Sequence, residues 1–151
     1  MRVTRSSLSR EGVNTWLVPS ANLELVRSLY ADWARGDFSS TDWAHPEVEF
    51  VIADGPSPGI WRGLAGLAEG YGEWLAGWED VQVTADRYYE LDEERILVSV
   101  RGHGRGRTSG LTMGDLQAEG GANLFHVSDG KVTRLVLSYD GRRAFAELGI
   151  A

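Results

Sequence analysis

Asp54 is the residue of this chain best placed to act as a base. It follows the apolar segment Val48 to Ile52 and opens a stretch, residues 54–59, that holds two prolines and two glycines. A carboxylate beside a cavity walled by tryptophan would lose hydration, so its pKa would rise and it could accept a proton near neutral pH. The alternative is a turn residue whose side chain bonds the backbone two residues further on.

Residues 101–107 alternate basic side chains with glycine. In a strand, all the basic side chains would share one face. We expect a hairpin that closes near residues 110–112 and places partner positions of the returning strand on this face: Asp115, Gln117, Glu119, Gly121 and Asn123. Opposed charges would stabilise the pairing by about 0.2–1 kcal/mol per pair. One interpretation is therefore a solvated, ion-paired hairpin.

The other interpretation of this strand is catalytic. In this interpretation Arg101 lies near the mouth of a pocket, together with Asn123 and Glu119. Its guanidinium could there hold a carboxylate or enolate oxygen of a ligand. The Asn123 amide can donate a hydrogen bond at any pH, which suits oxyanion stabilisation. His103 could act as a base, because a neutral imidazole titrates near physiological pH.

The chain shows no pattern of metal ligands. It has three histidines and no cysteine. His45 precedes Pro46 in a loop and is expected to be structural, whereas His126 is expected on the strand face opposite Asn123. We therefore predict no metal site, no disulfide and no cofactor.

Six tryptophans in 151 residues suggest a flat, apolar cavity whose N–H groups could orient a polycyclic or terpenoid ligand. Trp74 and Trp78, however, lie at helical spacing, as plain core residues do. The predicted ligand-binding residues are Tyr30, Trp33, Trp43, Trp61, Tyr71, Trp74 and Phe125.

The elements that must position these residues can be read from the apolar spacing. Helical periods occupy residues 22–35 and 64–78, and Asp140 can cap a short helix ending before Gly149. Strand patterns occupy residues 48–52, 81–91, 95–107, 116–127 and 132–139. Since the last four follow one another through short connections, they predict an antiparallel meander. Helices first and strands afterwards predict an α+β domain with helices over one face of a curved antiparallel sheet.

Composition limits the function classes. The length fits one domain, residues 21–151, preceded by an N-terminal arm, residues 1–20. A formal net charge of -7 argues against a nucleic-acid partner. The chain contains no apolar run of about 18 residues, and this absence argues against a membrane partner. The absence of cysteine fits a reducing compartment, so we expect the cytoplasm.

Several segments carry a family resemblance. Residues 30–38, 45–50 and 61–63 resemble the first half of nuclear-transport-factor-2-like proteins, and residues 128–132 with Tyr139 and Asp140 are similar to SnoaL-like members. The resemblance spans residues 22–150. It implies a cone, in which a strongly bent sheet wraps a pocket closed by helices, commonly dimeric through the outer sheet face. These motifs concern the scaffold and carry no chemistry of their own.

Within that family, ketosteroid isomerases imply specific roles. Asp54 matches the position of their proton-abstracting aspartate, and Asn123 matches that of a protonated acid that donates to the oxyanion. Tyr30 lies one residue from their donor tyrosine, a helical rotation of about 100°. Limonene-type epoxide hydrolases carry an Arg-x-Asp pair where this chain has Arg101 and His103, so that activity is not expected.

Two functions of different class remain open. One is a cofactor-independent isomerase, cyclase or dehydratase for a small hydrophobic carbonyl or polycyclic compound, with Asp54 or His103 as base and Asn123 and Arg101 as oxyanion stabilisers. The other is a non-catalytic binding or dimerisation module. A homodimer is expected in either case.

Overall fold

The computed structural model describes residues 20–117 and 120–150, so the predicted arm lies almost wholly outside the described residues. The elements are α1 (Ala21–Trp33), β1 (Ala44–Ile52), β2 (Gly59–Arg62), α2 (Gly63–Ala76), β3 (Trp78–Glu90), β4 (Arg95–Gly106), α3 (Met113–Leu116), β5 (Gly121–Ser128), β6 (Lys131–Ser138) and α4 (Gly141–Glu147).

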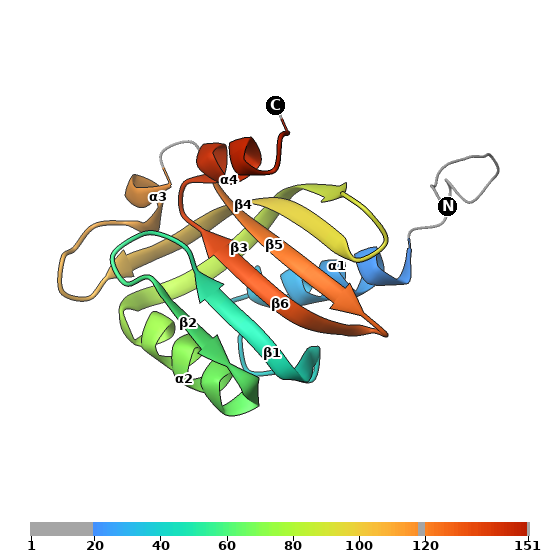
Figure 1. Cartoon of the computed structure of the whole chain (residues 1–151). Helices are drawn as coiled ribbons and strands as arrows, with labels where there is room; N and C mark the ends of the chain where they lie inside the picture. The colour runs from blue at the N-terminus through green and yellow to red at the C-terminus, as the bar shows by residue number, and fades with distance from the viewer. Residues whose placement is uncertain (1–19, 118–119, 151) are drawn as a thin grey trace.

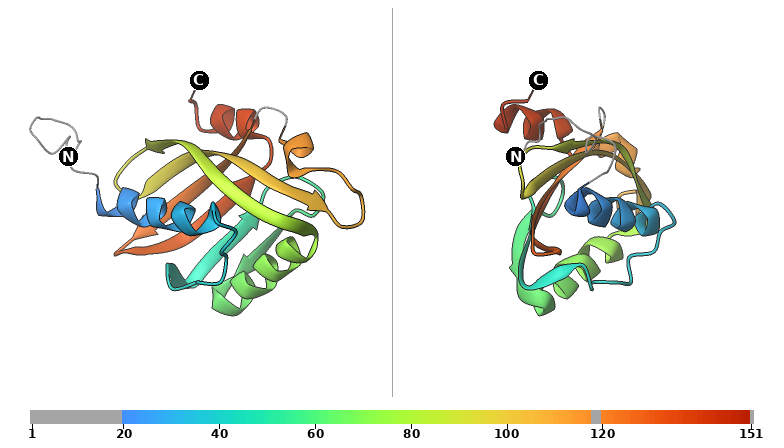
Figure 2. Two further views of the ribbon diagram at one scale, coloured as in Figure 1. Left: turned by 180° about the vertical axis from the view of Figure 1, so that it is seen from behind. Right: turned by 90° about the vertical axis from the view of Figure 1, so that its right-hand side faces the viewer.

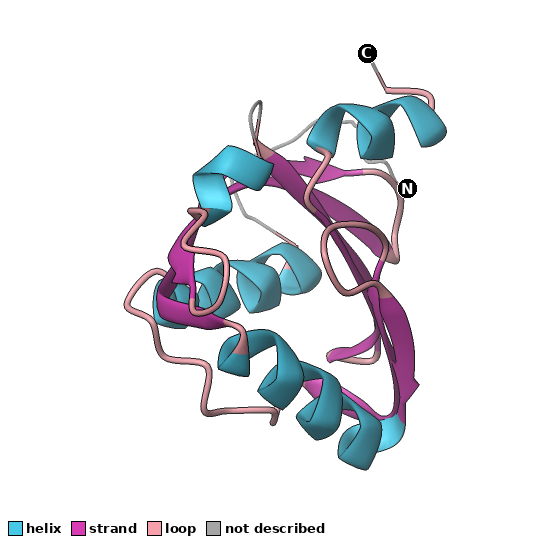
Figure 3. Ribbon diagram, turned by 90° about the vertical axis from the view of Figure 1, so that its left-hand side faces the viewer, coloured by secondary structure: helices cyan, strands magenta, loops and turns pink. Residues whose placement is uncertain are grey.

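One six-stranded sheet, in the order β2-β1-β6-β5-β4-β3, forms the body of the molecule (Figure 1). The sheet is strongly bent and leaves α1 and α2 on its concave side, whereas α4 lies on the outer side (Figures 2 and 3). The expected α+β cone and the antiparallel meander β3 to β6 are confirmed. One pair differs from the expectation, because β1 joins β6 in parallel.

The helix ends follow local chemistry. Ser20 caps α1, since its side chain accepts a hydrogen bond from the Leu23 amide, and Asp140 caps α4 through the Arg143 amide. Gly36 and Gly149 follow α1 and α4 with φ of 79° and 73°, a conformation that favours glycine. The three helices predicted from the sequence are therefore confirmed as α1, α2 and α4, with ends shifted by one or two residues.

The strand predicted at residues 116–127 is wrong in its first part. Thr112 and Asp115 form a capping box, in which each side chain accepts from the other's backbone amide, and this starts α3. The strand β5 begins only at Gly121 and pairs with β4 from Val100 back to Arg95. The short edge strand β2, against β1, was not anticipated.

The basic strand consequently has a different partner from the one expected. Its residues pair with β3, where Arg101 lies opposite Thr84 and His103 opposite Gln82. Arg101 forms an ion pair with Asp86 at 2.9 Å, and Arg107 forms one with Glu79 at 3.5 Å. The ion-paired surface is present, but the acidic residues come from the preceding strand. Glu119 lies outside the described residues.

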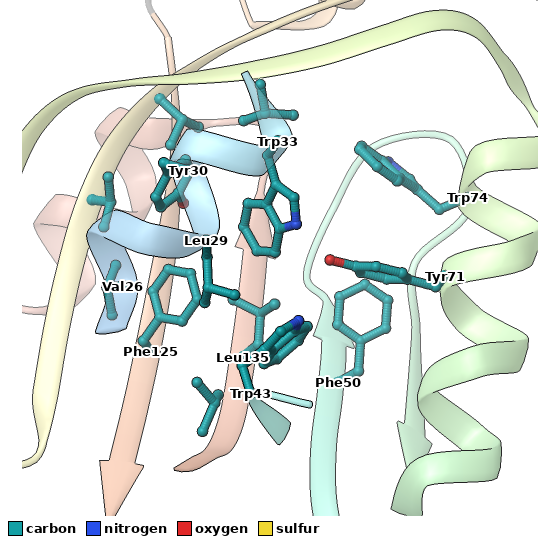
Figure 4. Packing of buried hydrophobic residues seen from close by; sticks show 14 of the residues in the cluster. Val26, Leu29, Tyr30, Trp33, Trp43, Phe50, Tyr71, Trp74, Phe125 and Leu135 are labelled. Atoms are coloured by element: carbon teal, nitrogen blue, oxygen red, sulfur yellow. The ribbon is translucent and has the colours of Figure 1, made fainter. Parts of the chain in front are cut away.

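Aromatic side chains fill the concave side of the sheet. Figure 4 shows them pointing from α1, α2 and the strands into one shared interior. The rings contact one another mainly edge to face; Trp33, for example, lies 5.0 Å from Tyr30 and 6.0 Å from Trp43 between ring centroids. These packed rings form the hydrophobic core between the sheet and the two helices.

The outer sheet face carries an apolar row with one residue from each strand. Strand register places these residues side by side: Ile60, Val51, Val136, Leu124, Leu97 and Tyr89. At one end α4 packs on the row, with the Phe145 ring 5.3 Å from that of Tyr89. A homodimer through this face stays a prediction. Among the described residues, none of the helices has the length and apolar character needed to cross a membrane.

Candidate functional site

A hollow of about 430 Å³ opens where α2, the ends of β1 and β6, and the loop after β4 meet. Its walls are mostly apolar, with hydroxyl groups and one carboxylate among them. Its lining residues include Trp61, Glu73, Trp74, Trp78, Leu111 and Tyr139. We call this hollow the aromatic pocket.

Tyr139 supplies the buried polar group of the aromatic pocket. Its side chain is only 4% exposed, and its hydroxyl oxygen accepts a hydrogen bond from Trp74 Nε1 at 2.9 Å. The Trp78 ring lies nearby, with its centroid 6.4 Å from that of the Tyr139 ring. Since an indole N–H can only donate, the hydroxyl proton is not used in the contact with Trp74. No acceptor for that proton is found among the described residues, so it is free for a ligand.

Burial keeps this hydroxyl protonated. Loss of hydration raises the pKa of Tyr139, and the hydrogen bond from Trp74 offsets only part of that rise. The group is therefore a neutral donor at physiological pH and not a base. Its chemistry is to donate a hydrogen bond to an oxygen or nitrogen acceptor.

Asp54 and Gly55 hold Tyr139 in place. The Asp54 carboxylate accepts from the backbone amides of Tyr139 at 2.6 Å and Asp140 at 3.1 Å, and from Arg143 Nη2 at 2.6 Å. Gly55 lies directly against the Tyr139 ring, where a side chain would collide with it. The turn after β1 thus positions the tyrosine by contacts that span 85 residues of sequence.

These contacts overturn the expected chemistry of Asp54. Burial alone would raise the pKa of Asp54, but hydrogen bonds from Arg143, Tyr139 and Asp140 together lower it below its usual value. The predicted rise is therefore wrong. The alternative turn role is also wrong in detail, because the side chain bonds a distant segment and not the backbone two residues on. In this structure Asp54 positions Tyr139.

Five of the seven predicted ligand-binding residues do not line the aromatic pocket. Tyr30, Trp33, Trp43, Tyr71 and Phe125 are buried in the interior with exposed fractions of 7% or less. The other two, Trp61 and Trp74, do line the pocket. Ligand binding by the interior five stays a prediction, and their rings occupy the space that a ligand would need.

Asn123 has a specific partner in this interior. Its Nδ2 donates to the Tyr30 hydroxyl at 2.8 Å, and both side chains are buried. The two residues that the isomerase resemblance singled out therefore contact each other directly. Burial also raises the pKa of Tyr30 well above its usual value, so this hydroxyl stays protonated.

Arg101 and His103 do not join Asn123. Val98, which pairs with Asn123, points inward, so Arg101 and His103 lie on the opposite face of β4. Both are exposed, and Arg101 is held by Asp86. The expected convergence of Arg101, His103, Asp54 and Asn123 in one cavity is not found.

Sequence reasoning gave Glu73 and Tyr139 no chemical role. Tyr139 was visible only as part of a scaffold motif, and its importance depends on a contact with Trp74 across 65 residues. Glu73 was visible only as a polar position outside the apolar face of α2. Within the described part of the chain, no group of histidine and carboxylate side chains could hold a metal ion.

Comparison with known proteins supports the fold. A comparison with curated proteins finds no match. Among solved structures, TerC co-crystallised with polyporic acid is 24% identical, with a TM-score of 0.64 over 85% of this chain and 98% of that chain. A nuclear-transport-factor-2-like protein of unknown function from Burkholderia pseudomallei is 18% identical, with a TM-score of 0.67 over 85% and 97% of the two chains.

A third structure, from Sinorhizobium meliloti and named as a candidate polyketide cyclase, is 14% identical with a TM-score of 0.56 over 83% of this chain and 99% of that chain. At these identities the likeness concerns the fold alone. The model of the SnoaL-like domain matches residues 26–135, which is most of the chain. Together with the bent sheet around α1 and α2, this match establishes that the chain belongs to the SnoaL-like domain family.

Proposed function

We propose that this protein binds a small, flat, largely apolar compound in the aromatic pocket, and that Tyr139 donates a hydrogen bond to an oxygen of that compound. The observation that carries the proposal is the unused hydroxyl proton of a 4% exposed tyrosine that lines the pocket. A buried donor without an acceptor costs about 1–3 kcal/mol, and a bound acceptor would recover that cost.

The pocket walls fit such a ligand. Its volume of about 430 Å³ falls in the range of small-molecule sites, roughly 300–1,000 Å³. Trp61, Trp74 and Trp78 offer flat apolar surfaces, and aromatic walls favour aromatic guests. Simple aryl ketones such as acetylnaphthalene therefore belong in a first ligand panel.

The test is a titration followed by tryptophan fluorescence. Compounds that fill the pocket should quench its indoles with saturation. Tyr139→Phe should weaken binding about tenfold, the value of one hydrogen bond. Tyr30→Phe is the matched control, since it removes a buried hydroxyl outside the pocket and should leave binding unchanged. Failure of every panel member to bind, or equal binding by Tyr139→Phe and the native chain, would contradict the proposal.

A second candidate function is cofactor-independent proton transfer on the bound compound. It is favoured by one observation: the Tyr139 donor and the Glu73 carboxylate line the same pocket. Enolisation needs a donor at the carbonyl oxygen and a base at the adjacent carbon. Glu73 would take the proton from carbon and return it, while Tyr139 stabilises the enolate oxygen.

Deuterium exchange tests this second function independently of any known substrate. Acetylnaphthalene in deuterated buffer should exchange its methyl protons faster with the native protein than without it, as followed by proton NMR. Glu73→Gln should abolish the acceleration without abolishing binding. Binding without accelerated exchange would leave the protein as a binding module and remove the catalytic function.

A further inference from the structure

We infer that the aromatic pocket selects ligands by charge, taking uncharged or cationic aromatic compounds and rejecting anions, and that Glu73 is the residue that sets this selectivity. The inference rests on the proposed binding function and adds the ligand class. It further predicts a ligand with an acceptor oxygen for Tyr139 and no negative charge.

The charge that lines the pocket is negative. Glu73 is the only charged side chain among the described residues that line it, and none of those lining residues is lysine, arginine or histidine. Arg143, four residues after Tyr139, is held by Asp54 at 2.6 Å and by Glu147 at 2.8 Å. Arg107, next to the loop that lines the pocket, is paired with Glu79.

Tyr139 alone would give the opposite selectivity. A neutral hydroxyl donates more strongly to a charged oxygen than to a neutral one, so a pocket with only this donor would favour a carboxylate or phenolate. Glu73 reverses the preference, because it repels a second negative charge and offers nothing to offset the desolvation of an anion. Removal of Glu73 should therefore abolish the preference for uncharged over anionic compounds.

The size of the effect follows from exposure. Glu73 is exposed on α2, so water and salt screen its charge. Two unit charges about 4 Å apart in bulk water repel by about 1 kcal/mol, which corresponds to about a fivefold change in affinity. The selectivity should also decrease as salt is added.

Matched naphthalene probes test the inference. Acetylnaphthalene is neutral, and naphthoate is an anion of similar shape. At low salt the native protein should bind acetylnaphthalene about fivefold more tightly than naphthoate. Glu73→Gln should raise the naphthoate affinity about fivefold relative to that of acetylnaphthalene.

Glu69→Gln is the control variant. It removes the same charge one turn earlier on α2, at an exposed residue that is not among the pocket-lining residues. An equal gain in naphthoate affinity in Glu69→Gln and Glu73→Gln, or naphthoate binding as tightly as acetylnaphthalene to the native chain, would overturn charge selection by Glu73. No binding of any probe would instead defeat the proposed function itself, so the two failures are distinguishable.

Discussion

The interior and the aromatic pocket are built from the same residue types, but packing leaves them in different states. In the interior, Tyr30 receives its hydrogen bond from Asn123, and the rings of Trp33 and Phe125 lie 6.2 Å apart in a stacked arrangement. In the pocket, Tyr139 also receives a hydrogen bond, from Trp74, and its ring lies 6.4 Å from that of Trp78, but it borders a hollow as well.

The difference shows that aromatic content alone does not mark a binding site. A ring surrounded by other rings contributes to the free energy of folding, because it has already made the contacts that a ligand would offer. A ring beside a hollow still has a surface to offer. Packing decides which ring does which: Tyr30 and Trp33 of α1 lie in the interior, whereas Trp74 of α2 lines the hollow.

The largest expected effect tests whether the interior rings contribute more to stability than the rings beside the pocket. Phe125→Ala should lower the free energy of unfolding by about 3–5 kcal/mol, because the ring is fully buried and its loss leaves a cavity. Trp61→Ala removes a larger ring, but one that lies against the pocket and is only partly buried. It should cost less than half as much in urea denaturation. Equal losses would mean that both regions are core.

Asp54→Asn tests the clamp that places Tyr139. The carboxylate accepts three hydrogen bonds, one from a charged guanidinium, and its side chain is only 20% exposed. Weakening this set should cost about 2 kcal/mol of unfolding free energy, measured by urea denaturation at pH 7. Ligand affinity should fall as well, since Tyr139 loses its support. An unchanged stability would contradict the positioning role.

The same variant has a pH signature. The pKa of Asp54 is lower in the folded chain than its unfolded value of about 3.9, so its stabilisation is complete above that value. It is lost as pH falls through the folded pKa, because the carboxyl then binds a proton in both states. The stability difference between the native chain and Asp54→Asn should therefore be constant above about pH 5 and shrink below about pH 4.

A smaller effect is expected for the buried Tyr30 and Asn123 pair. Tyr30→Phe leaves the Asn123 amide without an acceptor in the interior and should cost about 1–2 kcal/mol of unfolding free energy. Adding Asn123→Leu removes the stranded amide, so the double variant should recover part of that loss. A double-mutant cycle in urea measures the coupling, and additive losses would show that the hydrogen bond is absent in solution.

The fold could be predicted from the sequence because its signals are local. Asp140 and Gly149 mark the two ends of α4 by cap chemistry, and two-residue alternation marks β3, β4 and β6. The same local chemistry explains the one misplaced strand, since the capping box of Thr112 and Asp115 favours a helical turn over an extended start of β5. The alternation of apolar and polar residues alone does not show that a helical turn competes with the strand at this position.

The site could not be predicted in the same way because its contacts are distant in sequence. Asp54 was found as a notable carboxylate, but its role depends on Tyr139 and Arg143, 85 and 89 residues away. Burial raises a carboxyl pKa and hydrogen bonds lower it, so the net direction requires knowledge of the partners. Arg101 likewise could not be assigned to a face of the sheet before its strand partner was known.

The smallest expected effect compares two glycines of α2 that lie two residues apart. A Cβ at Gly70 would come within 2.7 Å of Trp61 and 3.0 Å of Phe50, whereas a Cβ at Gly72 would meet nothing within 4 Å. Gly72→Ala should therefore stabilise the helix by about 0.5–1 kcal/mol through propensity alone. Gly70→Ala should lose that gain, because the Trp61 ring must move. It should also alter ligand affinity, since Trp61 forms part of the pocket wall.

The two variants should therefore differ in both urea denaturation and ligand titration. If they gave the same stability and the same affinity, Trp61 would not be held between α2 and β1, and the pocket wall that it forms would not be rigid.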